Sequence, residues 1–353
     1  MIKYEDIKSL HIEPTQQCNA ACPQCDRNIN GGKDNPYLRG SLLSWTDYME
    51  MFPQDFVAQL DTMYMCGNYG DPATSHYIVN GYQYFRNVNS KMWLGMNTNG
   101  GARPEYFWED LADCGVVITF SIDGLEDTNH LYRQKVKWQN VMTNAQAFID
   151  RGGRARWEFI VFKHNEHQIE EAELRAKNMG FEQFRTKKTG RFFSTVNHKG
   201  KESHQATNRK GKNTQKLEKP TGDYVNPALK KEKDIVAEHG SMDAYYDETP
   251  IKCKAIEKSE IYVSAEAHVF PCCWTAGQQY KWYHKPREAP IWKLIEDPNN
   301  ISLRHHSLQD IVEGQFFKAI EDSWSCSSIK DGKLKVCANK CGIGFDAYKA
   351  QWE

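Results

Sequence analysis

Three cysteines near the start of the sequence are the residues best suited to chemistry. Cys18, Cys22 and Cys25 lie within the segment HIEPTQQCNAACPQCDRN at residues 11–28. A loop this short lets each sulfur point inward toward one inorganic group. A structural zinc ion normally takes four ligands, and no nearby Cys or His completes such a set. Three thiolates on a [4Fe-4S] cube would instead leave one iron open, so that a chelating small molecule could bind there and receive an electron.

Six further cysteines follow residue 250 and indicate a second inorganic site. They are Cys253, Cys272, Cys273, Cys326, Cys337 and Cys341. Adjacent residues on a strand point to opposite faces, so Cys273 is expected to pack away from the ligands. The remaining thiols suffice for one [4Fe-4S] cluster, and a zinc site of four thiolates is the alternative. Cys66 and Cys114 lie in apolar stretches and are expected to be packed thiols.

Alternating strand-like and helix-like segments in the first 190 residues must position these groups. Strands are expected at residues 9–13, 62–66, 93–98, 116–122, 157–162 and 183–187. Helices are expected between them, among others at 46–58, 104–114, 141–151 and 166–179. Six strand–helix repeats predict an α/β fold with a parallel sheet, which right-handed crossovers would curl into a partial or full barrel.

The composition is that of a globular protein of 353 residues, with 40% hydrophobic residues and a net charge of -1. Charge alone would therefore hold neither nucleic acid nor a membrane. No apolar run approaches the roughly 18 residues of a membrane span, and the charged start MIKYEDIKSLHIEP is unlike a signal peptide. Eleven cysteines, an odd number, argue against a disulfide framework. We expect a reducing, cytoplasmic location.

A polar segment at residues 196–240 is expected to separate a domain at 1–195 from a smaller domain at 241–353. Between Lys199 and Lys219 there are seven Lys or Arg against two Glu, with almost no apolar residues. Such a composition is typical of a solvated linker or insertion. A basic arm that meets an acidic peptide, nucleic acid or a partner protein is the alternative.

Together, these motifs resemble the radical S-adenosylmethionine (SAM) superfamily, whose signature is the same C-x3-C-x2-C loop after the first barrel strand. The segment CGNYGDP at residues 66–72 resembles the family motif whose backbone binds the SAM amino group, and glycine suits a close backbone approach. NTNG at 97–100 and SIDG at 121–124 end the next strands, where the family binds ribose and methionine. The SAM site implied by the resemblance consists of Gly67, Gly70, Asp71, Pro72, Asn97, Thr98, Asn99, Ser121, Asp123 and Arg133. Arg133 is the expected partner of the SAM carboxylate, because guanidinium binds carboxylate in a fork.

Two features depart from the family pattern. Gln24 precedes the third cysteine where many members have an aromatic residue that packs on adenine. Asp71 replaces the usual Glu, and Asn68 and Tyr69 lengthen the glycine spacing. Neither departure removes a cluster ligand, so both are interpreted as subfamily features.

The later cysteines are similar to the auxiliary-cluster domain called SPASM, or to its shorter form, twitch. Ala267 occupies the glycine position before Cys272, and the tail lacks the full four-cysteine run, which favours the single-cluster twitch form. The ligands implied are drawn from Cys253, Cys272, Cys326, Cys337 and Cys341. The fold implied is a partial (β/α)6 TIM-like barrel with a smaller C-terminal α+β auxiliary-cluster domain.

The resemblance implies an enzyme that reductively cleaves SAM at a [4Fe-4S] cluster and so generates a 5'-deoxyadenosyl radical for hydrogen abstraction. A reduced flavodoxin or ferredoxin would supply the electron. The basic segment and aromatics such as Trp274 and Tyr280 favour a peptide or protein substrate; a small metabolite is the alternative, and a nucleic acid is less expected. No general acid or base stands out, although Asp123, Glu158 and His164 lie near strand ends. A non-catalytic iron-sulfur or zinc scaffold or electron carrier is the competing hypothesis, but it would not need the strand-end motifs of a SAM pocket.

Overall fold

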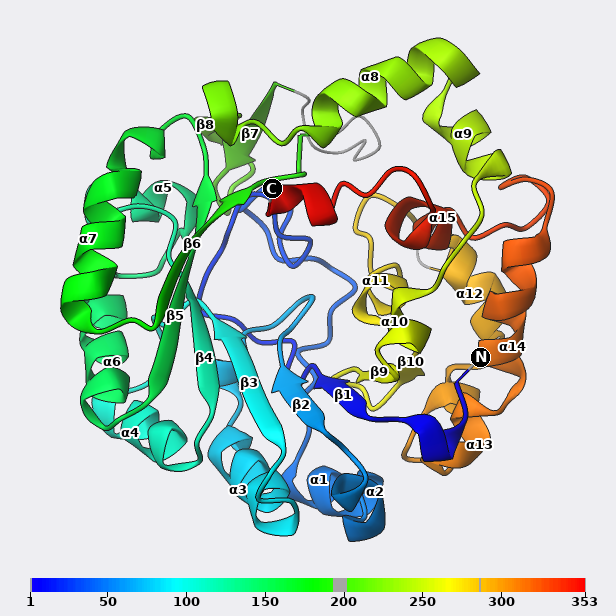
Figure 1. The fold of residues 1–353 in the computed structure, drawn as a ribbon, viewed down its shortest axis with the longest axis horizontal. Coiled ribbons are helices and arrows are strands. Elements are labelled where there is room, and N and C mark those ends of the chain that lie inside the picture. The colour runs from blue at the N-terminus through cyan, green and yellow to red at the C-terminus, as the bar shows by residue number, and fades with distance from the viewer. Residues whose placement is uncertain (1, 193–201, 286, 353) are drawn as a thin grey trace.

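Six parallel strands in sequential order form the curved sheet at the centre of the protein, as a computed structural model of residues 2–192, 202–285 and 287–352 shows (Figure 1). They are β1 (Ser9–Ile12), β2 (Thr62–Met65), β3 (Trp93–Thr98), β4 (Val117–Ser121), β5 (Arg154–Val161) and β6 (Gln183–Lys188). All six expected strands are confirmed, and the largest shift is the earlier start of β5. The fold is a mixed α/β, partial TIM-like barrel, as the alternating pattern predicts.

Helices cover the outer face of this sheet (Figure 1). They are α1 (Trp45–Met51), α2 (Gln54–Ala58), α3 (Ile78–Val88), α4 (Glu105–Asp113), α5 (Asn129–Tyr132), α6 (Trp138–Asp150) and α7 (Ile169–Met179). The single helix expected at 46–58 is divided into α1 and α2 at Pro53, which has no backbone N–H to continue the first helix. Gly180 ends α7 with φ 91°, a left-handed conformation that suits glycine.

The C-terminal region continues the barrel sheet. Strand β9 (Glu260–Val263) pairs in parallel with β1, and β10 (Val269–Phe270) pairs antiparallel with β9. Ile261 and Phe270 belong to the same apolar core as Leu10 and Ile12. Burial of one shared core therefore joins the barrel to the cysteine-bearing tail.

Short helices are the main regular elements of the remaining C-terminal chain (Figure 1). They are α9 (Met242–Glu248), α10 (Lys254–Glu257), α11 (Cys273–Ala276), α12 (Pro290–Ile295), α13 (Leu308–Val312), α14 (Gln315–Asp322) and α15 (Lys335–Cys341). Within the described ranges, none of the helices combines the length and apolar character that crossing a membrane requires.

The polar segment after the barrel folds into regular structure where it is described. It contains an antiparallel hairpin, β7 (Ser203–Thr207) and β8 (Asn213–Glu218), and then α8 (Ala228–His239). The His204 ring and the Pro23 carbonyl oxygen are 3.0 Å apart, and the Thr207 backbone N–H donates to the Asn30 carbonyl oxygen at 2.9 Å. The described part of this segment therefore packs on the cysteine loop. The predicted boundary near residue 195 lies outside the described residues.

The inner face of the barrel is polar. Asn97 on β3 is exposed, while Arg156 and Glu158 on β5 and Arg185 and Lys187 on β6 are only partly buried. Glu158 Oε2 and Lys187 Nζ approach to 3.9 Å. Side chains at such positions usually fill a TIM barrel with apolar atoms, so this interior has the character of a ligand site instead.

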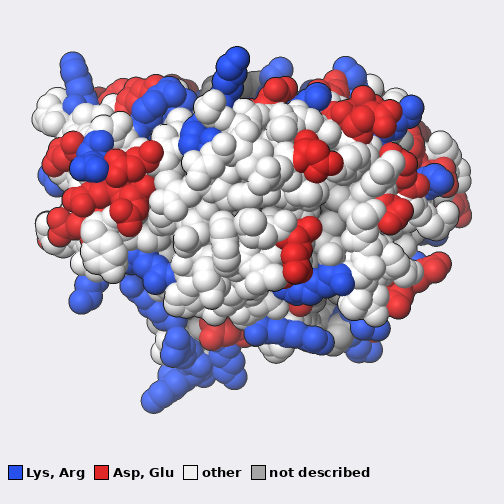
Figure 2. Space-filling model, turned by 90° about the horizontal axis from the view of Figure 1, so that it is seen from below, with Lys and Arg blue, Asp and Glu red and all other residues white. Residues whose placement is uncertain are grey.

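Figure 2 shows the underside of the molecule, where basic and acidic side chains surround a largely uncharged centre. This distribution agrees with the net charge of -1.

We expect Ile261→Ala to lower the free energy of unfolding of the whole barrel by about 2–5 kcal/mol, because the side chain is 0% exposed in the shared core. Urea denaturation followed by circular dichroism measures this change. Leu174→Ala is the control, since Leu174 is 58% exposed and its truncation should change stability by no more than about 0.5 kcal/mol. A barrel transition that keeps its wild-type midpoint in Ile261→Ala would contradict the shared core.

Candidate functional site

The three N-terminal cysteines converge in the loop that follows β1. All three are reduced, with Cys22 buried and Cys18 and Cys25 partly buried. Burial raises the pKa of Cys18, and the nearby charges of Asp71, Cys22 and Cys25 raise it further. The thiols are thus close enough to influence one another's ionisation, as one shared inorganic group requires.

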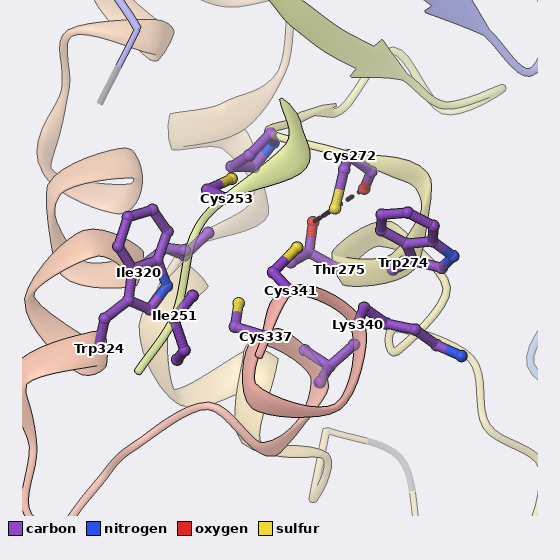
Figure 3. A pocket seen from close by; sticks show the side chains of 12 residues that line it. Ile251, Cys253, Cys272, Trp274, Thr275, Ile320, Trp324, Cys337, Lys340 and Cys341 are labelled. Atoms are coloured by element: carbon purple, nitrogen blue, oxygen red, sulfur yellow. Dashed lines mark hydrogen bonds between the residues drawn. The ribbon is translucent and has the colours of Figure 1, made fainter. Parts of the chain in front are cut away.

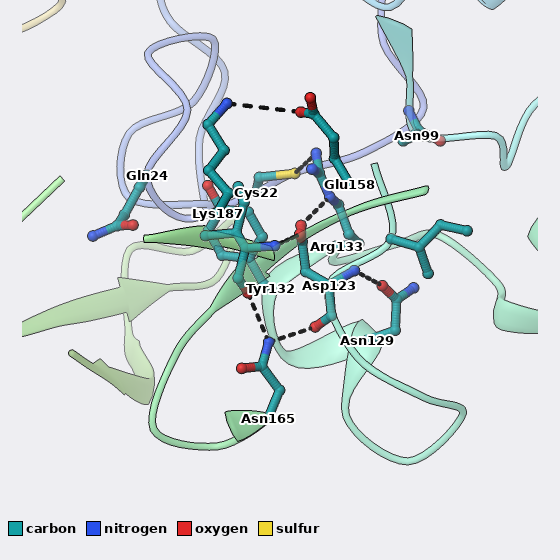
Figure 4. Close-up of polar contacts among 12 residues, drawn as sticks. Cys22, Gln24, Asn99, Asp123, Asn129, Tyr132, Arg133, Glu158, Asn165 and Lys187 are labelled. Atoms are coloured by element: carbon teal, nitrogen blue, oxygen red, sulfur yellow. Dashed lines mark hydrogen bonds and ion pairs between the residues drawn. The ribbon is translucent and has the colours of Figure 1, made fainter. Parts of the chain in front are cut away.

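Several N–H groups are directed at these sulfurs. The Ala20 backbone N–H donates to Cys18 Sγ at 3.3 Å, and Asn99 Nδ2 donates to the same sulfur at 3.8 Å. Arg133 Nη1 donates to Cys22 Sγ at 3.7 Å (Figure 4). Hydrogen bonds to cysteine sulfurs stabilise thiolates and tune iron–sulfur clusters. The donor set of this loop therefore fits a [4Fe-4S] cluster.

Asp71 joins two of the predicted SAM motifs. Its carboxylate accepts hydrogen bonds from Thr98 Oγ1 at 2.8 Å, from the Asn99 backbone N–H at 2.8 Å and from Asn99 Nδ2 at 2.5 Å. It also accepts from the Ala73 backbone N–H at 3.0 Å, at the start of the 3-10 helix η2 (Pro72–Thr74). Desolvation in this buried position raises the pKa of Asp71. The ends of β2 and β3 are therefore held together beside the cysteine loop.

Gly67 and Gly70 allow the chain itself to pack closely. A Cβ on Gly70 would lie 1.8 Å from the Thr15 carbonyl oxygen, and one on Gly67 would lie 2.3 Å from the Gly70 carbonyl oxygen. Sequence reasoning explained these glycines by the approach of a ligand to the backbone. In the structure, the space that a side chain would need is taken by neighbouring backbone.

Asp123 holds Arg133 in place. Asp123 is 0% exposed, and its Oδ2 accepts from Arg133 Nε at 2.6 Å while Oδ1 accepts from the Ile160 backbone N–H at 2.6 Å (Figure 4). Asn129 and Asn165 hydrogen-bond to the backbone of Asp123. The guanidinium is thereby fixed between the end of β4 and Cys22. Of the two residues predicted in this part of the SAM site, Arg133 is the one directed at the cysteine loop.

Asn97 and Ser121 lie on the inner face of the barrel. Asn97 is exposed near the end of β3, and Ser121 is partly buried at the end of β4. Both are next to the hydrogen-bonded unit that Asp71 forms with Thr98 and Asn99. The structure therefore brings all the strand-end motifs of the sequence prediction to the carboxyl edge of the sheet, where parallel barrels bind ligands.

Glu13 is a residue of the candidate site that sequence reasoning missed. Its Oε1 accepts from the backbone N–H groups of Tyr69 at 2.6 Å and Gly70 at 3.0 Å, and Tyr262 donates its hydroxyl to Oε2. Burial raises the pKa of Glu13 to about 7, although these hydrogen bonds oppose the rise. The signal in the sequence was an acidic residue directly after a buried strand. Glu13 anchors the glycine motif to both β1 and β9.

Four of the later cysteines line one small apolar cavity (Figure 3). They are Cys253, Cys272, Cys337 and Cys341. A hydrogen bond between Cys253 and Cys341 lowers the pKa of Cys253 and raises that of Cys341. Burial raises the pKa of both Cys272 and Cys337. Four thiols around a single apolar cavity fit a fully coordinated cluster.

Two cysteines lie outside this group. Cys326 follows the 3-10 helix η6 (Ser323–Ser325) and does not line the cavity. Cys273 is the first residue of α11, and the charges of Cys272, Glu260 and Cys66 all act on its ionisation. It thus faces the barrel side of α11. Among the described residues, no three His, Cys, Asp or Glu side chains are spaced to hold a single metal ion, so the structure by itself assigns no metal to either set of thiols.

Comparisons with known proteins place the fold. No protein-family model and no curated protein matches the sequence. Among solved structures, the chain is similar to SuiB of Streptococcus suis bound to S-adenosylmethionine, with 15% identity over 94% of this chain and 72% of SuiB and a TM-score of 0.54. It is also similar to anSMEcpe with bound AdoMet, with 13% identity, 98% and 94% coverage and a TM-score of 0.53.

SuiB and anSMEcpe are radical SAM enzymes of the SPASM or twitch type. The chain has the fold of this class, and the resemblance inferred from its motifs is confirmed at the level of the fold.

We expect Glu13→Gln to change how stability depends on pH. The folded chain keeps the Glu13 proton up to about pH 7, whereas an unfolded glutamate ionises near pH 4.5. Raising the pH from 5 to 7 should therefore lower the free energy of unfolding of the wild type by about 1–3 kcal/mol relative to that of the variant, which cannot ionise at this position. Urea denaturation at both pH values measures the difference, with the exposed Glu105→Gln as control. If the difference in free energy of unfolding between wild type and Glu13→Gln is the same at both pH values, Glu13 is already ionised in the folded chain at pH 5.

Proposed function

We propose that the protein is a radical SAM enzyme whose cluster is held by Cys18, Cys22 and Cys25. The observation that carries this proposal is the convergence of these thiols with two strand-end motifs that Asp71 joins into one unit. A cluster held by three cysteines keeps one iron available for a small ligand. An electron carrier or scaffold protein would have no use for that arrangement of strand ends.

The residues around the thiols have distinct proposed roles. When bound, the cluster supplies the electron that cleaves SAM into methionine and a 5'-deoxyadenosyl radical. Arg133, held by Asp123, binds the SAM carboxylate. Asn97 and Ser121 hydrogen-bond the ribose from the inner face of the barrel. Glu13 and Asp71 touch the backbone of the motifs and position them.

A second cluster is proposed at Cys253, Cys272, Cys337 and Cys341. The support is that these four thiols line one cavity, with Trp324 and Ile320 in its wall (Figure 3). The buried indole N–H of Trp324 acts on the Cys337 thiol, where it opposes the rise in pKa that burial causes, which suits a wall facing cluster sulfur. This cluster would receive an electron from a substrate radical or hold the substrate.

We propose a peptide or protein substrate in the polar interior of the barrel. SuiB is solved with its precursor peptide SuiA, at 14% identity and a TM-score of 0.50, over 82% of this chain and 66% of SuiB. The enzyme anSMEcpe is solved with the Cp18Cys peptide, at 14% identity and a TM-score of 0.52, over 98% and 94% of the chains. Charged, partly buried side chains such as Glu158 and Lys187 could hydrogen-bond a peptide backbone there.

We expect Cys18→Ala, Cys22→Ala or Cys25→Ala to remove about four of about eight irons from the anaerobically reconstituted protein and to abolish 5'-deoxyadenosine formation. Iron analysis and chromatography of the SAM products measure both effects. Cys114→Ala is the control, because that thiol is buried at the end of α4, where it hydrogen-bonds the Asp110 carbonyl oxygen. Continued 5'-deoxyadenosine formation in any of the first three variants would refute the proposal.

The two candidates for the fourth auxiliary ligand are separated by a second experiment. Cys337→Ala should lose about four irons while keeping the first cluster, whereas Cys326→Ala should keep all of them, since only Cys337 lines the cavity. Mössbauer or electron paramagnetic resonance spectra of the reduced proteins identify which cluster is lost. The reverse result would assign Cys326 as the ligand.

A further inference from the structure

A basic groove of about 600 Å³ lies between the segment at 36–41 and the chain from Glu266 to His305. Five Lys or Arg side chains line it against a single carboxylate, that of Glu266. The five are Arg39, Lys281, Lys285, Arg287 and Arg304. His268, His284 and His305 add further nitrogen atoms. For a chain with a net charge of -1, this is a strongly uneven local distribution.

The one carboxylate that lines the groove, Glu266, lies among these positive charges. Tyr280 donates its hydroxyl to Glu266 Oε2, and burial raises the pKa of Glu266. Arg39 and Arg304 both act on Glu266, and Arg39 and Arg287 both act on Tyr280. Guanidinium groups from three separate segments therefore act on the same two neighbouring residues, Glu266 and Tyr280.

Two of these arginines form no ion pair with a carboxylate in the part of the chain that the structure describes. Lys281 pairs with Asp26, Lys285 with Glu288 at 3.5 Å, and Arg304 with Asp47 at 2.8 Å. Among the described residues, no carboxylate forms an ion pair with Arg39 or Arg287, and both are exposed. The Arg287 guanidinium lies 5.7 Å from the centre of the Trp292 ring. The groove thus offers unpaired positive charge beside aromatic surface.

The groove is attached directly to the loop of the third cysteine. Lys281 pairs with Asp26, the residue after Cys25. Asn35 Nδ2 donates to the Asp26 carbonyl oxygen at 2.9 Å and to the Tyr280 carbonyl oxygen at 2.7 Å. The Tyr37 hydroxyl donates to the His284 carbonyl oxygen at 2.9 Å. A partner seated in the groove would therefore lie against the chain that holds Cys25.

A second connection reaches the SAM motif. The Tyr69 hydroxyl donates to the Gly277 carbonyl oxygen at 3.0 Å and accepts from the Tyr280 backbone N–H at 3.2 Å. Tyr69 lies inside the glycine motif that Glu13 anchors. Tyr69 thus links Tyr280, which lines the groove, to the glycine motif of the proposed SAM pocket.

We propose that this groove is the docking surface for a small acidic electron-transfer protein that reduces the cluster on Cys18, Cys22 and Cys25. This inference rests on the proposed function and deepens it by assigning the partner's site. The carrier loses one electron and the cluster gains it, with no bond made or broken in the docking step. Opposite charges speed the encounter of such partners, and the effect weakens as salt screens the charges.

The test compares two reductants on a variant of the groove, Arg39→Glu/Arg287→Glu. With a reduced acidic flavodoxin at low salt, the variant should form 5'-deoxyadenosine at least about tenfold more slowly than the wild type, and the gap should narrow as salt is raised. With dithionite, which needs no docking surface, both should react at the same rate. Lys91→Glu/Lys177→Glu is the matched control: it makes the same change in net charge at two exposed lysines outside the groove, and it should behave as wild type with either reductant.

A direct binding measurement tests the docking proposal independently of the proposed function. Flavodoxin should bind the wild-type chain and the control variant in a titration, and it should bind the groove variant at least about tenfold more weakly. Failure of the wild type to cleave SAM even with dithionite would overturn the proposed function. The titration would still show whether flavodoxin binds at the groove.

Several results would overturn the docking proposal itself. One is an equal loss of rate with flavodoxin and dithionite, which would place the groove in substrate or SAM binding. Another is flavodoxin binding that the groove variant leaves unchanged. A third is tight, groove-dependent binding of a short RNA or a polyglutamate peptide while flavodoxin does not bind, which would reassign the surface to a substrate.

Discussion

Buried carboxyl groups that accept hydrogen bonds from backbone N–H groups hold the candidate site together. Asp71 accepts from the chain at the end of β3, and Glu13 accepts from the chain after β2. Glu13 directly follows β1 and Asp71 lies in the loop after β2, and each carboxyl group binds the segment that follows or ends the next strand. Leaving a buried N–H without a partner costs about 1–3 kcal/mol, so these contacts stabilise one arrangement of the strand ends over others. The geometry of the cysteine loop depends on that arrangement, because Gly70 packs against Thr15 just before the first cysteine.

The pairing of β1 with β9 relates the two sets of thiols to each other. The first set follows β1, and the second includes Cys272, which follows β10. Tyr262 on β9 also donates to Glu13, so the same strand contacts both the auxiliary region and the SAM motif. Both sets are thus built outward from one continuous sheet. Their separation is fixed by strand register, which hydrogen bonds and a buried core hold rigidly.

Much of the barrel could be predicted from the sequence because its information is local. Each strand is a short apolar run bounded by turn residues, and each motif follows such a run directly. Pairings between distant segments could not be predicted in this way. Nothing near Glu260–Val263 shows that this strand joins β1, and Glu13 resembles any acidic residue after a strand until Tyr69 and Tyr262 are seen beside it. The choice between Cys326 and Cys337 likewise depends on how α15 folds back onto α11, which spacing alone leaves open.

The hairpin of β7 and β8 packs against the cysteine loop, although it comes much later in the chain. His204 contacts Pro23, and Thr207 donates to Asn30. The ribosome makes these bracing residues long after it has made Cys25. A nascent chain thus exposes its first thiols well before their surroundings can close, and iron delivered early would meet a loop without its native support. The cysteine loop can reach its native surroundings only after the hairpin has been synthesised.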